Sequence, residues 1–440
     1  MGATCCKYEQ SSRAREEVDL NHFHLLRAIG KGAFGKVRMI QHKRTKRYYA
    51  LKYIRKDTCI HKKAVKHVIA ERHMLENINY SLVVNMHYAF QDDENLFMAL
   101  DLMPGGDLRF LLENIGTLSE LEVRFQVAEI ALCLDYLHQQ RIAHRDVKPE
   151  NILLDQHGHA HLSDFNIATR FDQYSPLQWS VAGSPAYMAP EILSKKGYST
   201  SVDWWSLGVV AYELLFGKRP FDGPSHESLT ESIVHHPLTF PKHANRVVSD
   251  NCLDVLTKLL EKSPFHRLGC GSDGFERLKE HPWFNGLDWS LLEQKRAKPP
   301  YQPESCRFLT RMYEDSSIDQ DPLTHKHVFP ANWSNSELPV TEEARWRQCM
   351  EEEFLSYNHT FLSTKQVDVG IKALWGKYGL VKQFEDFEEH DYETTPNTDE
   401  GQEARLLIEQ HKRKPGKYQT TRDKLSSVTG TPKTIQQIEY

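Results

Sequence analysis

Residues 144–151, with the sequence HRDVKPEN, hold side chains suited to transferring a phosphoryl group to an alcohol. This reaction needs a carboxylate that orients the attacking hydroxyl and accepts its proton, and it needs metal ligands and cations that neutralise the phosphate charge. Asp146 would supply the carboxylate, Lys148 a cation and Asn151 an oxygen ligand for the metal. Asp164, which begins an Asp-Phe-Asn run, adds a second hard oxygen ligand of the kind that Mg²⁺ prefers. We therefore assign Asp146 and Lys148 as catalytic residues, and Asn151 and Asp164 as metal ligands.

A glycine-rich stretch near the start of the chain is a candidate phosphate-binding loop. Residues 30–37 read GKGAFGKV, and a β-like segment follows the third glycine. The GxGxxG pattern alone is weak, because dinucleotide-binding folds use it before a helix, and a plain β-hairpin is a further alternative. Glycines would let the backbone close over phosphates where a Cβ atom would collide. The candidate nucleotide-binding residues here are Ile29, Gly30, Lys31, Gly32, Ala33, Phe34, Gly35, Lys36 and Val37.

Lys52, on the next expected strand, is the candidate cation for the α- and β-phosphates. An unpaired lysine buried between strands is costly, so Lys52 needs a carboxylate partner, and Glu71 on the following helix is well placed. Neither residue alone carries this interpretation, because a solvated surface lysine is the commoner case. We assign both to the catalytic site, and we assign to the nucleotide site Ala50, Leu100, Asp101, Met103 and Leu153.

The elements that must position these residues change in type along the chain. In the first part of the chain, apolar residues occur at alternate positions in segments separated by glycine turns, which indicates strands. Beyond the Pro-Gly-Gly run at 104–106, the spacing of the apolar residues becomes helical. We expect strands within 23–53, 83–90 and 95–100, and helices over 63–76, 121–137 and 202–216. The predicted fold class is α+β, with a small antiparallel β lobe that carries one helix and a larger, mainly helical lobe.

The composition is that of an ordinary globular protein. Of the 440 residues 40% are hydrophobic, and the formal net charge of −5 gives no reason to expect nucleic acid as a partner. No apolar stretch reaches the roughly 18 residues of a membrane-spanning helix, and the polar N-terminal region contains no secretory signal. The eight cysteines show no zinc or disulfide spacing. We expect an intracellular, cytoplasmic protein, and since nothing indicates stable oligomers, a monomer.

Taken together, residues 23–284 resemble a eukaryotic protein-kinase domain, with the family's motifs in their expected order. The likeness continues through the Ala-Pro-Glu run that ends at Glu191, through Asp203 and through Arg267. The resemblance implies a bilobal kinase fold. It also implies a buried ion pair between Glu191 and Arg267, and an anchoring role for Asp203 under the catalytic loop.

Further motifs resemble serine/threonine kinases of the AGC group, and within it the YANK family. Lys148 has the serine/threonine pattern, the Asp-Trp-Trp-Ser-Leu-Gly run from Asp203 has the AGC pattern, and Asn166 replaces glycine after Asp-Phe as in YANK kinases. The resemblance implies phosphorylation of serine or threonine in proteins, with ATP and Mg²⁺ (or Mn²⁺) as cofactors. A left-handed backbone at Asn166 is expected, since asparagine tolerates it best after glycine. An active kinase is the favoured reading, and a nucleotide-binding pseudokinase scaffold is the alternative.

Three acidic positions match those that select basic substrates in the AGC pattern: Asp107, Glu150 and Glu213. Facing one groove, they would favour arginine upstream of the target hydroxyl through charge-assisted hydrogen bonds. Each would otherwise be an ordinary solvated acid. An apolar pocket for the residue after the target is expected from Val181, Pro185 and Met188.

Three regulatory residues are expected. Ser180 lies where AGC kinases are often phosphorylated, and a phosphate there would pair with Arg145 and His67, the alternative being an unmodified serine. Near the end of an expected helix over 341–357, Phe354 and Tyr357 resemble the AGC hydrophobic motif and would dock beside the Glu71 helix, unless this is a generic packed helix.

The ends of the chain suggest anchoring and a tail. Gly2 is a candidate for myristoylation, and Cys5 and Cys6 for palmitoylation, which would bring the protein to a membrane surface such as the inner face of the plasma membrane; a plain cytosolic N-terminus is the alternative. We divide the chain into an N-terminal segment (1–22), a kinase domain (23–284), an AGC-like extension (285–358) and a mostly disordered tail (359–440).

Overall fold

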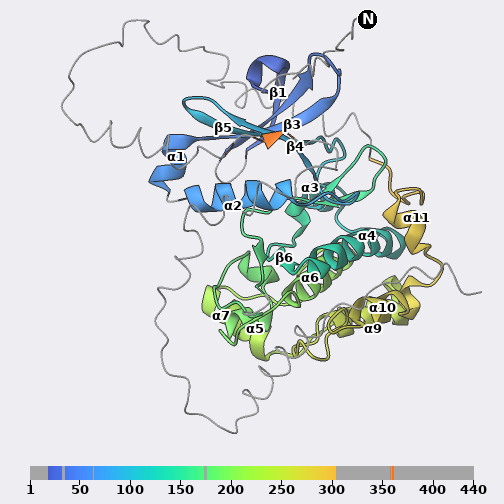
Figure 1. Cartoon of the computed structure of the whole chain (residues 1–440). Helices are drawn as coiled ribbons and strands as arrows, with labels where there is room; N and C mark the ends of the chain where they lie inside the picture. The colour runs from blue at the N-terminus through green and yellow to red at the C-terminus, as the bar shows by residue number, and fades with distance from the viewer. Residues whose placement is uncertain are drawn as a thin grey trace, which may run out of the picture.

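The computed structural model describes residues 18–31, 35–62, 64–172, 176–303, 357 and 359–360. Several sequence-based expectations lie outside these residues: Gly2, Cys5, Cys6, Gly32, Ala33, Phe34, Phe354, the helix over 341–357 apart from Tyr357, and the tail from residue 361. Within the described residues the chain forms two lobes, a sheet with α2 beneath it in blue and a set of helices in green to yellow (Figure 1). The expected bilobal α+β fold is confirmed.

The small lobe is an antiparallel sheet with the strand order β1-β2-β3-β5-β4-β10. After a short 3-10 turn, η1 (Leu20–His22), its strands are β1 (Phe23–Lys31), β2 (Lys36–His42), β3 (Tyr48–Arg55), β4 (Met86–Gln91), β5 (Asn95–Asp101) and β10 (His359–Thr360). Helices α1 (Lys56–His61) and α2 (Val65–Glu76) connect β3 to β4. Two expected boundaries were wrong: the strand expected over 83–90 begins at Met86, and the helix expected from residue 63 begins at Val65.

The large lobe is mainly helical. Its helices are α3 (Leu108–Ile115), α4 (Glu120–Gln139), α5 (Pro190–Leu193), α6 (Val202–Phe216), α7 (His226–His235), α8 (Ala244–Val247), α9 (Asp250–Leu259), α10 (Gly274–Lys279) and α11 (Trp289–Glu293), with 3-10 turns η2 (Pro149–Asn151), η3 (Pro185–Tyr187) and η4 (Pro282–Phe284). Two small sheets pair β6 (Ile142–Ala143) with β9 (Thr169–Arg170) and β7 (Ile152–Leu154) with β8 (Ala160–Leu162). The expected helices at 121–137 and 202–216 are confirmed.

Two apolar clusters stabilise this arrangement. One covers the outer face of the sheet and consists of Phe23, Ile40, Tyr49, Leu51, Tyr53, Phe90, Phe97 and Ala99. The other is continuous from α2 and the inner face of the sheet through α4, α6 and α9. This second core joins the lobes, so the residues at their junction are held from both sides.

The chain beyond the large lobe runs back to the β7–β8 hairpin. Gly158 in this hairpin has a φ of +96°, and a Cβ atom there would lie 2.1 Å from the carbonyl oxygen of Tyr301. Glycine is therefore required by the close approach of the extension. Across the described ranges, no helix combines the length and apolarity needed to cross a bilayer.

Candidate active site

Buried Asp203, in the first turn of α6, holds the loop that precedes Asp146. Its Oδ2 accepts a hydrogen bond from the backbone N–H of His144 (2.9 Å) and lies 2.9 Å from His138 Nε2, and its Oδ1 accepts from the backbone N–H of Arg145 (2.8 Å). Burial disfavours the charged form, but these partners hold the pKa of Asp203 below its ordinary value. The expected anchoring role is confirmed.

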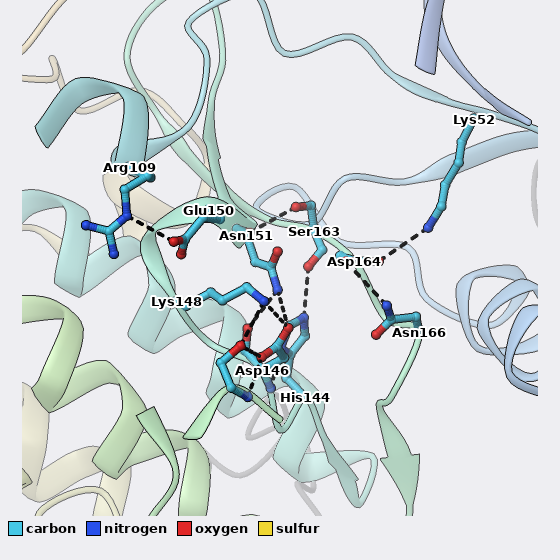
Figure 2. A network of polar contacts seen from close by, with 11 residues as sticks. Lys52, Arg109, His144, Asp146, Lys148, Glu150, Asn151, Ser163, Asp164 and Asn166 are labelled. Carbon is cyan, nitrogen blue, oxygen red and sulfur yellow. Dashed lines mark hydrogen bonds and ion pairs between the residues drawn. The ribbon is translucent and has the colours of Figure 1, made fainter. Parts of the chain in front are cut away.

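Asp146 is held by four hydrogen bonds from three residues. Its Oδ1 accepts from the backbone N–H (3.1 Å) and hydroxyl (2.8 Å) of Ser184, and its Oδ2 accepts from Lys148 Nζ (2.6 Å) and Asn151 Nδ2 (3.0 Å). Burial opposes ionisation, yet the bonds from Lys148 and Ser184 hold the pKa of Asp146 below its ordinary value of 3.8. Asp146 is therefore an ionised acceptor in a fixed orientation at neutral pH, and Figure 2 shows this network.

Lys52, from β3, lies between two carboxylates. Its Nζ is 2.6 Å from Glu71 Oε1 and 3.3 Å from Asp164 Oδ1, so the expected pairing with Glu71 is confirmed. Burial alone would lower the pKa of Lys52, but the carboxylates of Glu71 and Asp164 outweigh burial and raise it. Lys52 is thus a fixed positive charge at the junction of the lobes, directed toward Asp164 (Figure 2).

The backbone at the Asp-Phe-Asn run differs from our expectation. The left-handed conformation occurs at Asp164 (φ +64°), whereas Asn166 is not among the described residues with positive φ, so that prediction was wrong. The strain lies at the residue that carries the carboxylate, and Asn166 instead approaches Asp164 Oδ2 through its Nδ2 (3.5 Å). The asparagine therefore needs no left-handed backbone to occupy this position.

The nucleotide-site residues of the sheet share one face. Val37 is directly opposite Lys52 across β2 and β3, and Ala50 is directly opposite Leu100 across β3 and β5. Directly paired residues and residues two apart lie on the same face of a sheet. Val37, Ala50, Lys52 and Leu100 therefore line the face opposite the outer apolar cluster, on the side that meets Asp164.

The glycine loop is described only in part. A Cβ atom at Gly35 would lie 2.2 Å from the carbonyl oxygen of Tyr53, so the requirement for glycine there comes from β3, while a Cβ atom at Gly30 would make only an ordinary contact with Val37 at 3.8 Å. The backbone of Lys31 is paired with Lys36 across the hairpin, and Ile29 is half-buried beside them.

The segment between the lobes holds the remaining nucleotide-site residues. The Asp101 side chain contacts β4 and the residue before it. Its Oδ1 lies 2.6 Å from His87 Nε2, and its Oδ2 accepts a hydrogen bond from the backbone N–H of Asn85 (2.9 Å). Met103 and Leu153 are half-buried, and Leu153 forms an isolated β-bridge with Asp107.

The two expected metal ligands offer oxygen donors that suit Mg²⁺. Asn151 donates through Nδ2 to both the carbonyl oxygen (2.8 Å) and Oδ2 (3.0 Å) of Asp146, and none of the described residues donates a hydrogen bond to its Oδ1. Asp164 adds a carboxylate whose side chain is 34% exposed. One amide oxygen and one carboxylate are the ligands expected where substrate phosphates and water complete the coordination of Mg²⁺.

Two of the three expected substrate acids, Glu150 and Glu213, are bonded to an arginine. Arg109, from α3, bonds Glu150 Oε1 (2.9 Å), both carboxylate oxygens of Glu213 (3.1 and 3.2 Å) and the hydroxyl of Tyr187 (2.6 Å). Asp107 caps α3 by accepting the backbone N–H of Phe110 at its Oδ1 (2.8 Å). The structure therefore brings Glu150 and Glu213 together through Arg109.

The segment before η3 holds Ser180. Its hydroxyl accepts from Arg145 Nη1 (3.0 Å), which also bonds the hydroxyl of Tyr198 (2.9 Å), while His67 lies exposed on α2. Of the residues expected to form an apolar pocket for the substrate residue after the target, Val181 and Pro185 are exposed and Met188 is buried.

Tyr357 lies buried against α2, with 2% of its surface exposed. Arg72 Nε donates to its carbonyl oxygen (3.1 Å), and the next described residues, His359 and Thr360, add to the edge of the sheet at β4. Burial raises the pKa of the Tyr357 phenol well above its ordinary value, and its hydroxyl has no hydrogen-bond partner among the described residues. The segment thus contacts the helix that carries Glu71.

Comparison with known proteins agrees with this geometry. The protein kinase domain family matches residues 23–284. Serine/threonine-protein kinase 32C of Homo sapiens is 43% identical over 320 residues, which is 71% of this chain and 65% of that protein. Serine/threonine-protein kinase 32B of Homo sapiens is 37% identical over 374 residues (80% of this chain, 87% of that protein), and RAC-beta serine/threonine-protein kinase of Homo sapiens is 36% identical over 313 residues (71% and 64%).

This chain belongs to the protein kinase family. The expected resemblance to AGC kinases, and within them to the YANK family, is confirmed by the similarity to kinases 32B and 32C. The chain spans about two thirds of the length of kinase 32C.

Sequence reasoning missed two residues of the site. Ser184 was not assigned to the site, although it makes two of the bonds to Asp146. Arg109 was not considered, because an arginine in the first turn of a helix is usually solvated, and its partners are 41 and 104 residues away in the sequence. The available signal was that Arg109 follows Asp107, an expected substrate acid, by only two residues.

Proposed function

We propose that the chain is a serine/threonine protein kinase that transfers the γ-phosphoryl group of ATP to hydroxyl groups of other proteins. The observation that carries the proposal is the ionised, four-bonded carboxylate of Asp146 beside the oxygen ligands Asn151 and Asp164. Bound Mg-ATP would supply the phosphoryl group, with its charge offset by the metal that Asn151 and Asp164 would hold.

The chain's own residues would act by position and charge. Asp146 would orient the substrate hydroxyl and take its proton, while Lys148 and Ser184 keep the carboxylate ionised and fixed. Lys52 would bind phosphate oxygens, and Glu71 would hold Lys52 in place. Because most of this work is electrostatic positioning, small displacements of these groups are costly.

A peptide-library assay tests the proposal. Purified protein would be given Mg-ATP and peptides that offer only serine, threonine or tyrosine, and parallel reactions would replace Mg²⁺ by Mn²⁺ or by a chelator. We expect label on serine and threonine, little on tyrosine, and none with the chelator. Tight nucleotide binding without transfer to any peptide would instead identify a nucleotide-binding scaffold.

The substrate proposal is selectivity for arginine upstream of the target and an apolar residue after it. Its support is the position of Asp107, Glu150 and Glu213 on the matching family positions, and the exposure of Val181 and Pro185 near Ser184, which bonds Asp146. Equal turnover of peptides with and without upstream arginine would contradict it.

Two regulatory proposals use the contacts of Ser180 and Tyr357. A phosphate on Ser180 would extend its hydrogen bond with Arg145 into a charge-assisted pair, so Ser180→Ala would lower activity. Docking of the segment that contains Phe354 and Tyr357 would hold α2, and with it Glu71, toward Lys52; its support is the bond from Arg72, the neighbour of Glu71, to Tyr357. Unchanged activity after deletion of residues 341–440 would contradict this role.

The remaining proposals concern organisation and location. We propose an intracellular monomer in which residues 23–284 form the catalytic unit and residues 285–358 dock on it. The expected tail over 359–440 is shortened to 361–440, because His359 and Thr360 pair with β4 as strand β10. Acylation of Gly2, Cys5 and Cys6 would add attachment to the inner face of the plasma membrane. Imaging Gly2→Ala beside the parent protein tests the attachment, since an identical distribution would contradict it.

A further inference from the structure

Arg109 uses all three guanidinium nitrogens in its contacts with two of the expected substrate acids, Glu150 and Glu213, and with Tyr187. Nε donates to Glu150 Oε1 (2.9 Å), Nη1 to Glu213 Oε1 (3.1 Å), and Nη2 to Glu213 Oε2 (3.2 Å) and to the Tyr187 hydroxyl (2.6 Å). Figure 2 shows its side chain directed at Glu150, beside the loop that carries Asp146 and Lys148. These are the bonds by which paired carboxylates would bind the guanidinium of a peptide arginine.

Burial keeps the Glu213 carboxylate bonded within the chain rather than available to a substrate arginine. The Glu213 side chain is 7% exposed, and its Oε2 also accepts from the hydroxyl of Tyr187 (2.5 Å). Both of its oxygens are therefore engaged inside the protein. Arg109 is 24% exposed and Glu150 43% exposed, so the cluster is most accessible at Glu150.

We propose that Arg109 is a specificity-determining residue that fills, from within the chain, a guanidinium site which Glu150 and Glu213 would otherwise offer to a substrate arginine. The inference rests on the proposed kinase function and refines its substrate class. Asp107 caps α3 and makes no side-chain bond to Arg109. Its carboxylate therefore remains available to bind an upstream arginine of the substrate. The parent enzyme would then bind one upstream arginine of the substrate, and removal of Arg109 would create a second subsite for arginine.

The charge of the cluster gives the physical reason. Without Arg109, the buried carboxylate of Glu213 would lose the one guanidinium partner that the described residues give it, and it would lie close to a second carboxylate. Two neighbouring carboxylates in a partly buried site strongly favour capture of a cation. A peptide arginine that reaches the vacated position would regain the same bonds, each of them charge-assisted.

Positional peptide libraries compared between variants test the proposal. In Arg109→Ala, we expect arginine at one additional upstream position to raise kcat/KM by roughly tenfold to a hundredfold over alanine, which is the effect of one or two hydrogen bonds between charged groups. In the parent, the same position should change kcat/KM by less than about threefold. Arg246→Ala, which removes an exposed arginine of α8, is the matched control and should behave as the parent.

Two further variants separate specificity from folding. Arg109→Gln keeps most of the side-chain volume, and the same gain is expected from it if Arg109→Ala does not fold. The double variant Arg109→Ala with Glu213→Gln should lose the gain, since the buried charge that captures the peptide arginine is absent. Folded, active Arg109 variants with the parent's selectivity at every position would overturn the inference.

The outcomes also distinguish this inference from the function on which it rests. A parent enzyme without any arginine preference, beside an Arg109 variant that acquires one, would remove the arginine-directed part of the proposed function and support the role of Arg109. A protein that phosphorylates no peptide in any variant would remove the kinase proposal itself.

Discussion

Replacing Glu71 by glutamine perturbs the charge that fixes Lys52 at the junction of the lobes. The side chain of Glu71 is 3% exposed and that of Lys52 17% exposed, with 2.6 Å between Oε1 and Nζ. Removing one partner of a buried ion pair costs about 3–5 kcal/mol. Asp164, 3.3 Å from the same nitrogen, would relieve part of this cost by drawing Lys52 toward itself. We therefore expect the free energy of unfolding to fall by about 3 kcal/mol, near the lower limit. Because Lys52 would also be displaced from its position for binding phosphate, we expect kcat/KM to fall by roughly a hundredfold.

The assay is steady-state phosphorylation of one peptide at varied Mg-ATP, together with thermal melting. Because Lys52 would shift toward a proposed metal ligand, both a higher KM for Mg-ATP and a lower kcat are expected. Glu231→Gln, which makes the same chemical change at a glutamate that is 63% exposed on α7, should leave both unchanged. A folded Glu71→Gln enzyme within twofold of the parent in kcat/KM would refute the reasoning.

Three further perturbations have expected outcomes. Ser184→Ala removes a hydrogen bond to Asp146, whose pKa lies below 3.8 in the parent, and should raise that pKa. Since protonated Asp146 is inactive, the acid limb of the pH profile of kcat/KM should move to higher pH. An acid limb at the parent's pH would contradict the role of Ser184. Glu191→Ala leaves the fully buried Arg267 without its carboxylate partner (2.7 Å) and should cost about 3–5 kcal/mol, on the order of 10 °C in melting temperature, whereas replacing both by methionine should recover most of the loss. Tyr357→Ala should lower activity to that of a chain lacking residues 341–440, because truncating a buried aromatic ring costs about 3–5 kcal/mol. Tyr357→Phe should keep the parent's activity, since the Tyr357 hydroxyl has no hydrogen-bond partner among the described residues.

The parts of the fold that local pattern determines were predictable from the sequence. Helix α6 occupies the predicted residues, 202–216, because its apolar run ends at Gly217, which adopts a left-handed φ of +67°. The buried pair of Glu191 and Arg267 and the anchoring by Asp203 followed from the family resemblance, and both are confirmed. Asp146, Lys148, Asn151 and Asp164 could be proposed from the sequence because they lie in two short contiguous motifs.

The rest depends on contacts between distant segments. Helix α1, the six residues Lys56–His61, is too short to produce a periodic pattern of its own. The left-handed residue next to Phe165 is Asp164 rather than Asn166. Both residue types tolerate this backbone conformation, so the sequence alone does not determine which of them adopts it. The role of Arg109 arises only when α3, η2, η3 and α6 meet, which no local pattern indicates.

The most direct test of the account is the rate of phosphoryl transfer by Asp146→Asn under single-turnover conditions, with Mg-ATP binding measured on the same preparation. The amide keeps the size of Asp146 but cannot accept the proton of the substrate hydroxyl. The account predicts nearly unchanged Mg-ATP affinity and a rate reduced by roughly 10²–10⁴-fold, the usual contribution of a positioned general base. Transfer at the parent's rate by the folded variant would contradict the central role of Asp146.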